Sequence, residues 1–383
     1  MKAELPVLDP PERLLCGPGP TNVDPSVLEA MGRPMVGHLD PDFHGILLDV
    51  VDLLRRVYRA PEGIVLALHC TGTAGMETGV ANLLERGDKA IVAQAGFFGK
   101  RIAEIARRHG AEVVDVTAEW GEIVSIERLL ETLDRHPDAR LVAVVHAETS
   151  TGAEYPLAEL AEAMAGRPTL LMADCVTSLG GVPLDVGGWG IDFAYSCTQK
   201  CLAAPPGMSP IAVSERAVER LRARKTPVPF SFDLLMLERY WTERPAAYHH
   251  TAPILSIYAL HEALCRVLNE GLEQRWARHA EAAAYLRAEL AARELQLLAD
   301  PEHQLAPLTA VRVPEGTDGD AVQKRILREH GIEVGGGLGP AAPPMWRIGL
   351  MGRNATPETA DRVLAALDAA RAEEGTLAGK AAG

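Results

Sequence analysis

Short apolar runs alternate with amphipathic segments through the first two thirds of the chain, and this alternation limits the possible folds. Runs such as 64–69 (IVLALH) and 141–145 (LVAVV) have the length of buried strands. Strands that alternate with helices indicate crossover units and a mainly parallel sheet. We therefore predict an α/β domain with strands at residues 64–69, 89–94, 112–116, 141–146, 169–173, 192–196 and 209–213. The predicted helices between them span residues 76–85, 99–109, 125–135 and 156–165.

The pattern changes after about residue 255, which indicates a second unit. A long helix is predicted over 256–294, followed by short strands at 306–313 and 346–350 and helices at 318–330 and 356–372. The segment 225–253 is aromatic and proline-rich with weak periodicity, so we expect a structured surface excursion between the domains. A chain of 383 residues has room for two domains at roughly 150 residues each. The predicted division is an N-terminal arm (1–22), a large domain (23–270) and a smaller α+β domain (271–383).

Charge and hydropathy argue against several classes of partner. The formal net charge is −14, so the chain repels a phosphate backbone and is not expected to bind nucleic acid. No apolar run approaches the roughly 20 residues that span a bilayer. The N-terminus carries no signal-peptide pattern. We therefore expect no membrane partner and predict a cytoplasmic location.

The six cysteines are scattered along the chain and form no CxxC pair. A disulfide framework is not expected in a chain of this length and compartment. Cys197 and Cys201 flank Lys200, which raises the alternative of a metal or redox role. One CxxxC without a second ligand pair is weak support for it, so we interpret both as small, half-buried residues and predict no metal site.

Polar residues follow several of the predicted strands at the point where each strand ends. Thr71-Gly72-Thr73, Glu148-Thr149, Asp174 and Gln199-Lys200 occupy these positions. In an open parallel sheet, ligands bind outside the carboxyl ends of the strands. We therefore expect hydroxyls, a carboxylate and an amine to gather at one edge of the sheet.

The turn from Thr71 to Gly75 opens a predicted helix and offers free backbone N–H groups at the positive end of the helix dipole. This arrangement suits a phosphate, although a tight turn with a helix N-cap explains the same residues equally well. The turn is neither a P-loop, because no Gly-Lys-Ser/Thr follows, nor a dinucleotide fingerprint, because Gly72, Gly75 and Gly79 have the wrong spacing.

Asp174 and Lys200 stand where charge is costly. A carboxylate at the end of an apolar strand needs a cationic partner or serves as a helix N-cap, and the sequence leaves both alternatives open. Lys200 lies between an apolar strand and an Ala-Pro-Pro-Gly segment, which is not a solvated surface. A desolvated lysine has a lowered pKa and forms Schiff bases. A lysine, a counter-ion for a protonated ring nitrogen and a phosphate site are together what pyridoxal 5′-phosphate (PLP) requires.

Several segments resemble the alanine–glyoxylate and serine–glyoxylate aminotransferases of class V. They are residues 14–22 (LLCGPGPTN), 148–152 (ETSTG), 174–181 (DCVTSLGG), 196–207 (SCTQKCLAAPPG), 248–251 (YHHT) and 347–350 (RIGL). Their order and spacing hold from about residue 12 to 370. The resemblance implies the fold type I of PLP-dependent transferases and a PLP-dependent aminotransferase activity.

The resemblance also implies roles for residues of this chain. Lys200 would bind PLP as a covalent Schiff base and then move the α-proton, while Asp174 would hold the pyridine nitrogen protonated. Phe98 and Val176 would cover the two ring faces, with Phe98 in place of a tryptophan common in relatives, so the stacking is expected to be weaker. Thr149 would contact the ring oxygen. The phosphate would be held by Thr71, Gly72, Thr73 and Gln199, with Thr73 where animal relatives often have histidine.

Two further implications concern the partner subunit and the substrate. Tyr248 and Thr251 would reach the phosphate of the neighbouring subunit, so a homodimer would share its active sites. Arg347 would bind the substrate carboxylate with a bidentate fork, although without the resemblance it is an ordinary strand arginine. His38 and His44 lie in a segment like the family's substrate mouth, and we leave both out of the catalytic set.

The predicted reaction is a two-step transfer from alanine or serine to glyoxylate or pyruvate. A ureidoglycine–glyoxylate or 2-aminoethylphosphonate–pyruvate aminotransferase would share nearly every cofactor contact and stays open as an alternative. A cysteine desulfurase or another PLP-dependent lyase is disfavoured, because no cysteine follows Cys265. A catalytically silent binding protein would not need Lys200, Asp174 and Arg347 together, and a nicotinamide dehydrogenase would need the dinucleotide fingerprint.

Overall fold

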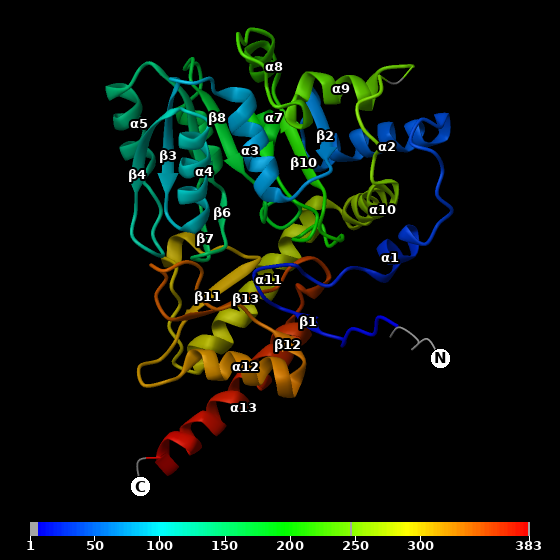
Figure 1. Ribbon diagram of the computed structural model, residues 1–383. Coiled ribbons are helices and arrows are strands. Elements are labelled where there is room, and N and C mark those ends of the chain that lie inside the picture. The colour runs from blue at the N-terminus through cyan, green and yellow to red at the C-terminus, as the bar shows by residue number, and fades with distance from the viewer. Residues whose placement is uncertain (1–6, 246, 382–383) are drawn as a thin grey trace, which may run out of the picture.

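A computed structural model describes residues 7–245 and 247–381, with side chains to residue 374. Its main feature is a seven-stranded sheet in the upper half of Figure 1. The strands are β2 (Ile64–Leu68), β3 (Lys89–Gln94), β4 (Glu112–Thr117), β5 (Ala139–Val145), β8 (Leu170–Asp174), β9 (Phe193–Tyr195) and β10 (Ser209–Val213). All seven predicted strands are confirmed, with ends shifted by one or two residues.

The sheet order is β2-β10-β9-β8-β5-β3-β4, and every pair is parallel except those that involve β10. Strands β2, β5 and β8 are apolar along nearly their whole length and almost entirely buried, as expected of a parallel sheet with both faces covered. The predicted α/β class with a mainly parallel sheet is therefore confirmed.

Helices cover this sheet directly or pack on the helices that do. They are α1 (Pro25–Met31), α2 (Pro41–Tyr58), α3 (Gly72–Leu83), α4 (Phe97–Arg108), α5 (Ile126–Arg135), α6 (Leu157–Ala163), α7 (Val186–Trp189), α8 (Glu215–Arg222), α9 (Leu234–Thr242) and α10 (Ile254–Glu270). Helices α3 and α4 pack side by side on the sheet (Figure 1). A Cβ at Gly75 would collide with the Ser209 side chain of β10, and one at Gly79 would come within 2.6 Å of the Phe193 ring of β9. These two glycines therefore let α3 approach the sheet closely.

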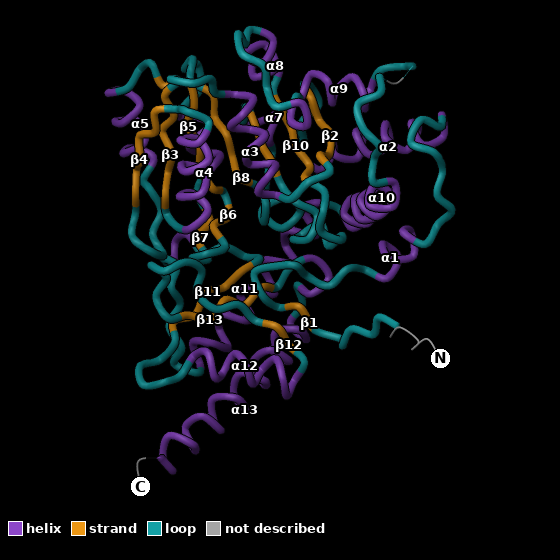
Figure 2. The backbone as a smooth tube through the Cα atoms, in the orientation of Figure 1, coloured by secondary structure: helices purple, strands orange, loops and turns teal. Residues whose placement is uncertain are grey.

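A second group of elements lies below the large sheet, and Figure 2 shows its strands as a separate set. It comprises α11 (Leu272–Ala292), β11 (Leu308–Arg312), α12 (Gly319–His330), β12 (Ile332–Glu333), β13 (Met345–Gly349) and α13 (Pro357–Ala381). Its core includes Trp346, Leu286 and Val363. Near the N-terminus, β1 (Leu14–Leu15) pairs with β12, and Cys16 joins this second core. The domain boundaries at residues 22 and 270 stay predictions.

Two sequence predictions are wrong in this region. The predicted helix over 256–294 is two helices, because Gly271 between α10 and α11 adopts a φ of 89° that favours glycine. The segment 225–253 is not only a surface excursion. It contains the 3-10 turn Phe230–Phe232 and helix α9, whose Leu237 and Tyr240 are buried in the main core. The apolar spacing in this helix was hidden by the flanking prolines.

The remaining short elements are the hairpin β6 (Ala147–Glu148) and β7 (Ala153–Glu154), and the 3-10 turns Pro301–His303 and Gly352–Asn354. No helix within the described residues is both long and apolar enough to cross a bilayer.

Candidate active site

The polar strand ends meet around one cavity of ≈ 210 Å³. Asp174 is the last residue of β8, Thr71 follows β2, and Lys200 follows β9. The sequence predicted this grouping from the rule for open parallel sheets. Nine predicted site residues line the cavity: Thr71, Gly72, Thr73, Phe98, Thr149, Asp174, Val176, Gln199 and Lys200.

The Gly/Thr turn is the first turn of helix α3. Thr71 is its N-cap, and the Thr71 hydroxyl accepts a hydrogen bond from the Ala74 N–H at 3.2 Å. The N-cap alternative is therefore correct for Thr71, but it occupies only one of the free amides. Within the described residues, the N–H groups of Gly72 and Thr73 have no acceptor. The phosphate site and the N-cap are thus compatible, because helix N-termini offer several donors.

Asp174 is 2% exposed and is held by two donors. Its Oδ2 accepts from the Tyr195 hydroxyl at 2.6 Å and its Oδ1 from the Val176 N–H at 2.9 Å. Burial raises the pKa of the Asp174 carboxyl to about 6, against the hydrogen bond from Tyr195. The carboxylate is therefore ionised at neutral pH and suits a cationic partner. Sequence reasoning missed Tyr195, which is the register partner of Asp174 on β9.

Lys200 is half-buried, and its Nζ donates a hydrogen bond to the Pro18 carbonyl oxygen. Burial lowers the pKa of the Lys200 amine. The turn that brings Pro18 here requires glycine next to it. Gly19 has a φ of 105°, and a Cβ there would come within 2.5 Å of the lysine side chain. The Gly-Pro-Gly-Pro motif near the N-terminus therefore closes over the lysine, a contact that sequence reasoning did not predict.

Arg101 also lines the cavity and was missed by the sequence analysis. Its Nη1 donates to the Thr73 hydroxyl at 3.1 Å, and its guanidinium lies 5.2 Å from the centre of the Phe98 ring. Among the described residues, no acidic side chain lies within 4 Å of it. Because Arg101 follows Phe98 by three residues on α4, helical spacing could have placed it on the same face.

Arg347 does not line this cavity but lies directly behind it, on β13. It is 6% exposed, and its Nη1 donates to the Thr149 carbonyl oxygen at 3.1 Å and its Nε to that of Gly336 at 2.6 Å. Within the described part of the chain, its Nη2 has no acceptor and no carboxylate lies within 4 Å. Burial lowers the pKa of Arg347 to about 10, so it keeps its charge at neutral pH. A buried and unpaired cation is costly unless an anion joins it.

Tyr248 and Thr251 are exposed and do not reach the cavity of their own chain. The residues between them are anchored: His249 stacks on Phe230, and His250 stacks on His69 with ring centres 4.0 Å apart. Neither His38 nor His44 lines the cavity.

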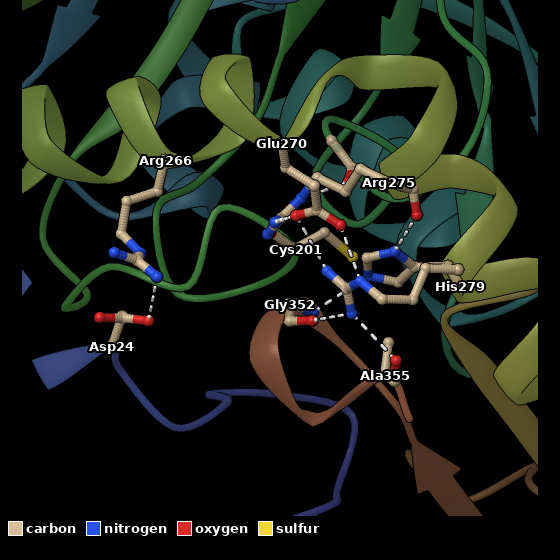
Figure 3. Close-up of polar contacts among 10 residues, drawn as sticks. Asp24, Cys201, Arg266, Glu270, Arg275, His279, Gly352 and Ala355 are labelled. Atoms are coloured by element: carbon tan, nitrogen blue, oxygen red, sulfur yellow. Dashed lines mark hydrogen bonds and ion pairs between the residues drawn. The ribbon is translucent and has the colours of Figure 1, made fainter. Parts of the chain in front are cut away.

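Behind Lys200, an arginine network joins the lysine loop to the second core (Figure 3). Arg275 Nη2 donates to the Cys201 carbonyl at 2.5 Å, and Arg278 Nη1 donates to the Gly352 and Ala355 carbonyls at 2.9 Å. Glu270 accepts from both arginines. Arg275 Nε also donates to the Gly180 carbonyl, so each nitrogen of this guanidinium has an acceptor and the network supports the lysine loop.

The cysteines beside Lys200 are fully buried, not half-buried as predicted. Burial raises the pKa of the Cys197 and Cys201 thiols to about 12, and Cys201 Sγ donates to the Thr177 carbonyl at 3.1 Å. Both are therefore protonated packing residues at neutral pH. Among the described residues, no group of three or more histidine, cysteine or acidic side chains is arranged to hold a metal ion.

Comparison with known proteins agrees with this geometry. The model of the family "Aminotransferase class-V" matches residues 15–358. The chain is 37% identical to the (S)-ureidoglycine–glyoxylate transaminase of Bacillus subtilis, over 97% of this chain and 94% of that protein. It is 40% identical to the alanine–glyoxylate aminotransferase of Rattus norvegicus, over 93% and 87%. The solved structure of an alanine–glyoxylate aminotransferase from Nostoc sp. superposes with a TM-score of 0.93 and 45% identity, covering 96% and 98%.

A seven-stranded α/β fold with a lysine and an aspartate at its strand ends defines a PLP-dependent transaminase of fold type I. The chain belongs to the class V aminotransferases.

Proposed function

We propose that this enzyme transfers the amino group of a small L-amino acid, alanine or serine, to glyoxylate or pyruvate in two half-reactions. The observation that carries the proposal is the buried, unpaired Arg347 directly behind a cavity that contains both Lys200 and Asp174. Among the described residues, Arg101 also has no acidic partner, but it would pair with the cofactor phosphate. This leaves Arg347 as the cation for the substrate and suits a substrate with one carboxylate. The names of the relatives from Rattus norvegicus and Nostoc sp. support the same substrates.

The cavity fits PLP by its unpaired polar groups. Gln199 Oε1 is buried without a donor among the described residues, and the amides of Gly72 and Thr73 are free. We propose that these groups, with Thr71, Thr73 and Arg101, hold the phosphate. Phe98 and Val176 would pack on the ring and Thr149 would contact its oxygen. When bound, PLP supplies an electron-withdrawing ring that stabilises negative charge left at the substrate α-carbon.

Lys200 has two tasks in this proposal. Its Nζ would hold the cofactor as a covalent Schiff base, and as the free amine it would accept the substrate α-proton and later return it. Burial lowers the pKa of the amine and so increases the fraction of the free base. The Pro18 carbonyl orients the amine from one side. Asp174, ionised and fixed by Tyr195, would pair with the protonated ring nitrogen.

Arg347 would bind the substrate carboxylate and thereby orient the α-carbon toward Lys200. The Thr149 and Gly336 carbonyls fix its Nη1 and Nε, and Nη2 stays available. Fixing the guanidinium in advance reduces the entropy lost on binding.

We also propose a homodimer with shared active sites. Thr71 and Thr73 are exposed in the single chain, so the phosphate site is open on one side. Tyr248 and Thr251 of the partner subunit would cover it. Large apolar side chains are exposed on the segments 28–39 and 230–248, which lie on the same side of the molecule in Figure 1: Leu28, Met35, Leu39, Phe230 and Met236. Exposed apolar groups of this kind favour a protein interface.

Two finer predictions stay proposals. The chain would divide into the arm 1–22, the large domain 23–270 and the small domain 271–383, and the enzyme would act in the cytoplasm.

A transfer from ureidoglycine to glyoxylate is the second candidate, because the Bacillus subtilis relative matches 97% of this chain. The two activities would use the same cofactor residues, so only the donor distinguishes them.

The test is the visible absorbance of the purified protein with PLP, using Lys200→Ala as the control. We expect the wild-type band to bleach with L-alanine and return with glyoxylate, and the variant to show no such cycle. A panel with serine, ureidoglycine, glutamate and aspartate assigns the donor. Faster transfer from glutamate or aspartate than from alanine would contradict the proposed substrate class.

A further inference from the structure

Glu148 is a buried carboxylate to which the proposed mechanism gives no task. It is 2% exposed and lies at the end of β6, next to Thr149. Its Oε1 accepts from the Ser150 N–H at 3.1 Å and the Ser150 hydroxyl at 2.5 Å. Its Oε2 accepts from the N–H groups of Phe98 at 3.1 Å and Gly99 at 3.4 Å. Burial raises the pKa of Glu148 to about 6, so at neutral pH it is an ionised acceptor for four donors.

These hydrogen bonds replace the missing cap of helix α4. The N-cap residue, Gly96, has no side chain to accept from the first turn. Ser150 Oγ accepts from the Phe97 N–H at 2.8 Å, so Glu148 and Ser150 together satisfy the first three amides of the helix. A Cβ at Gly96 would lie 2.5 Å from the Glu148 carboxyl carbon and would block this approach. A negative charge here is further favoured by the helix dipole.

The helix held in this way carries two residues of the cavity. Phe98 donates its own N–H to Glu148 and lines the cavity with its side chain. Arg101 lies one turn later on the same face and donates to Thr73. The position of Glu148 therefore determines where Phe98 and Arg101 lie along the cavity.

The same turn also holds the substrate arginine. The carbonyl of Thr149, the next residue, accepts from Arg347 Nη1 at 3.1 Å. The charge of Glu148 favours the protonated guanidinium and opposes the burial that lowers the pKa of Arg347. One short turn thus contacts α4 on one side and β13 on the other, although these elements lie more than 200 residues apart.

We propose that Glu148 is a positioning residue that aligns the ring-stacking Phe98 with the substrate-binding Arg347. Its carboxylate fixes α4 directly and fixes Arg347 through the backbone of its own turn. The inference rests on the proposed function, because it assigns Phe98 to the cofactor and Arg347 to the substrate.

The main test is Glu148→Gln. A glutamine has one acceptor oxygen and an NH₂ that must face donors, so half of the present hydrogen bonds are lost. We expect roughly 10-fold weaker PLP binding and a roughly 10-fold higher KM for alanine, with a smaller change in kcat, as for the loss of one or two buried hydrogen bonds. PLP binding is measured by absorbance titration and the kinetic constants by initial rates.

A second readout does not depend on activity. Hydrogen–deuterium exchange of the ligand-free protein should show faster exchange at residues 97–99 in the variant, with α3 unchanged. A purely structural role would lower the melting temperature without this local change or the split between KM and kcat. Unchanged exchange at residues 97–99, or unchanged PLP affinity and KM, overturns the inference.

Two further variants complete the test. Ser150→Ala removes two hydrogen bonds, the one that its hydroxyl accepts from the Phe97 N–H and the one that it donates to Glu148 Oε1, but it leaves the carboxylate. Because the negative charge at the helix N-terminus stays, we expect the same changes at roughly 3-fold, smaller than in Glu148→Gln. If Glu148→Gln does not fold, wild-type constants in Ser150→Ala overturn the inference. Glu154→Gln is the matched control, because Glu154 is half-buried in the same hairpin and does not line the cavity. If the wild-type protein itself fails to bind PLP in the absorbance titration, the proposed function is refuted. This outcome is distinct from a failure of the inference on Glu148.

Discussion

The large sheet brings a half-buried lysine to the site and strand β13 brings a buried arginine, and the surroundings of these two cations differ. Lys200 has the carboxylate of Asp174 in the same cavity, and burial lowers the pKa of its amine. Among the described residues, Arg347 donates hydrogen bonds only to carbonyls, and with the charge of Glu148 in its favour it stays protonated at neutral pH. A lysine with a lowered pKa suits proton transfer, whereas a guanidinium that stays charged suits anion binding. In the proposed function, the two cations would therefore have different tasks.

The largest effect is expected at Lys200. Lys200→Arg keeps a cation but removes the group that can give up and accept a proton. We expect the rate of amino transfer to fall by at least about 10³-fold, in the range of general base catalysis. Single-turnover kinetics with alanine measure it. A rate within tenfold of wild type would show that Lys200 acts only through its charge. The proposed difference between Lys200 and Arg347 would then be wrong.

Asp174→Asn removes the carboxylate that shares the cavity with Lys200 and leaves the hydrogen-bond partners of Arg347 in place. Burial raises the Asp174 pKa from 3.8 to about 6, so the folded state holds this proton more tightly than the unfolded state. The resulting stability is present below pH 3.8 and is lost as the pH rises through 6. The difference corresponds to about 3 kcal/mol at most. The ligand-free variant should therefore be more stable than wild type at pH 7.5, and not at pH 3.5, in urea unfolding.

The same variant should bind PLP more weakly, because an amide cannot pair with a protonated ring nitrogen. Equal stability of the two ligand-free proteins at both pH values would mean that Asp174 is fully compensated by Lys200 and Tyr195.

Arg347→Lys tests the other cation. The lysine keeps the charge but loses the fork and the bonds to the Thr149 and Gly336 carbonyls. We expect KM for alanine to rise roughly 30-fold, with PLP affinity unchanged, as for the loss of a charge-assisted bidentate contact. Steady-state kinetics and absorbance titration measure the two quantities. A larger change in PLP affinity than in KM would reassign Arg347 to the cofactor.

Arg101→Gln is expected to have the smallest effect. The guanidinium lies beside the Thr73 hydroxyl and the free amides of α3, at the exposed end of the cavity. Solvent screening reduces its contribution, so PLP affinity should fall roughly 5-fold, with KM for alanine unchanged. Inorganic phosphate should raise the melting temperature of the ligand-free wild type more than that of the variant. The opposite pattern, a raised KM alone, would place Arg101 on the substrate side.

Much of the site was predictable because its residues stand at strand ends. Asp174 and Lys200 follow apolar strands at the edge where parallel strands end together. A charge there is costly unless it has a partner or a function, which marks both as candidates. The same rule grouped Thr71 and Thr149 with them. The contact of Pro18 with Lys200, and that of Tyr195 with Asp174, could not be predicted, because they depend on how distant segments pack.

The errors have a similar cause. The break at Gly271 depends on a left-handed backbone that a helical pattern does not reveal, and α9 was obscured by the prolines around it. Cys197 and Cys201 were interpreted as half-buried, but both are fully buried. Cys201 packs in a small cluster with Val182 and Met351, a contact between distant segments that the sequence does not reveal.

The periodicity of the chain by itself determined the α/β class, the seven strands and the chemical groups at their ends, because these follow from local spacing and the cost of buried charge. The tertiary structure decided which groups touch. Glu148, Arg101 and Arg347 come close to one cavity only because α4, the turn at 148–150 and β13 pack together. Such contacts depend on the packing of segments that lie up to about 200 residues apart in the sequence, and a local sequence pattern does not reveal that packing.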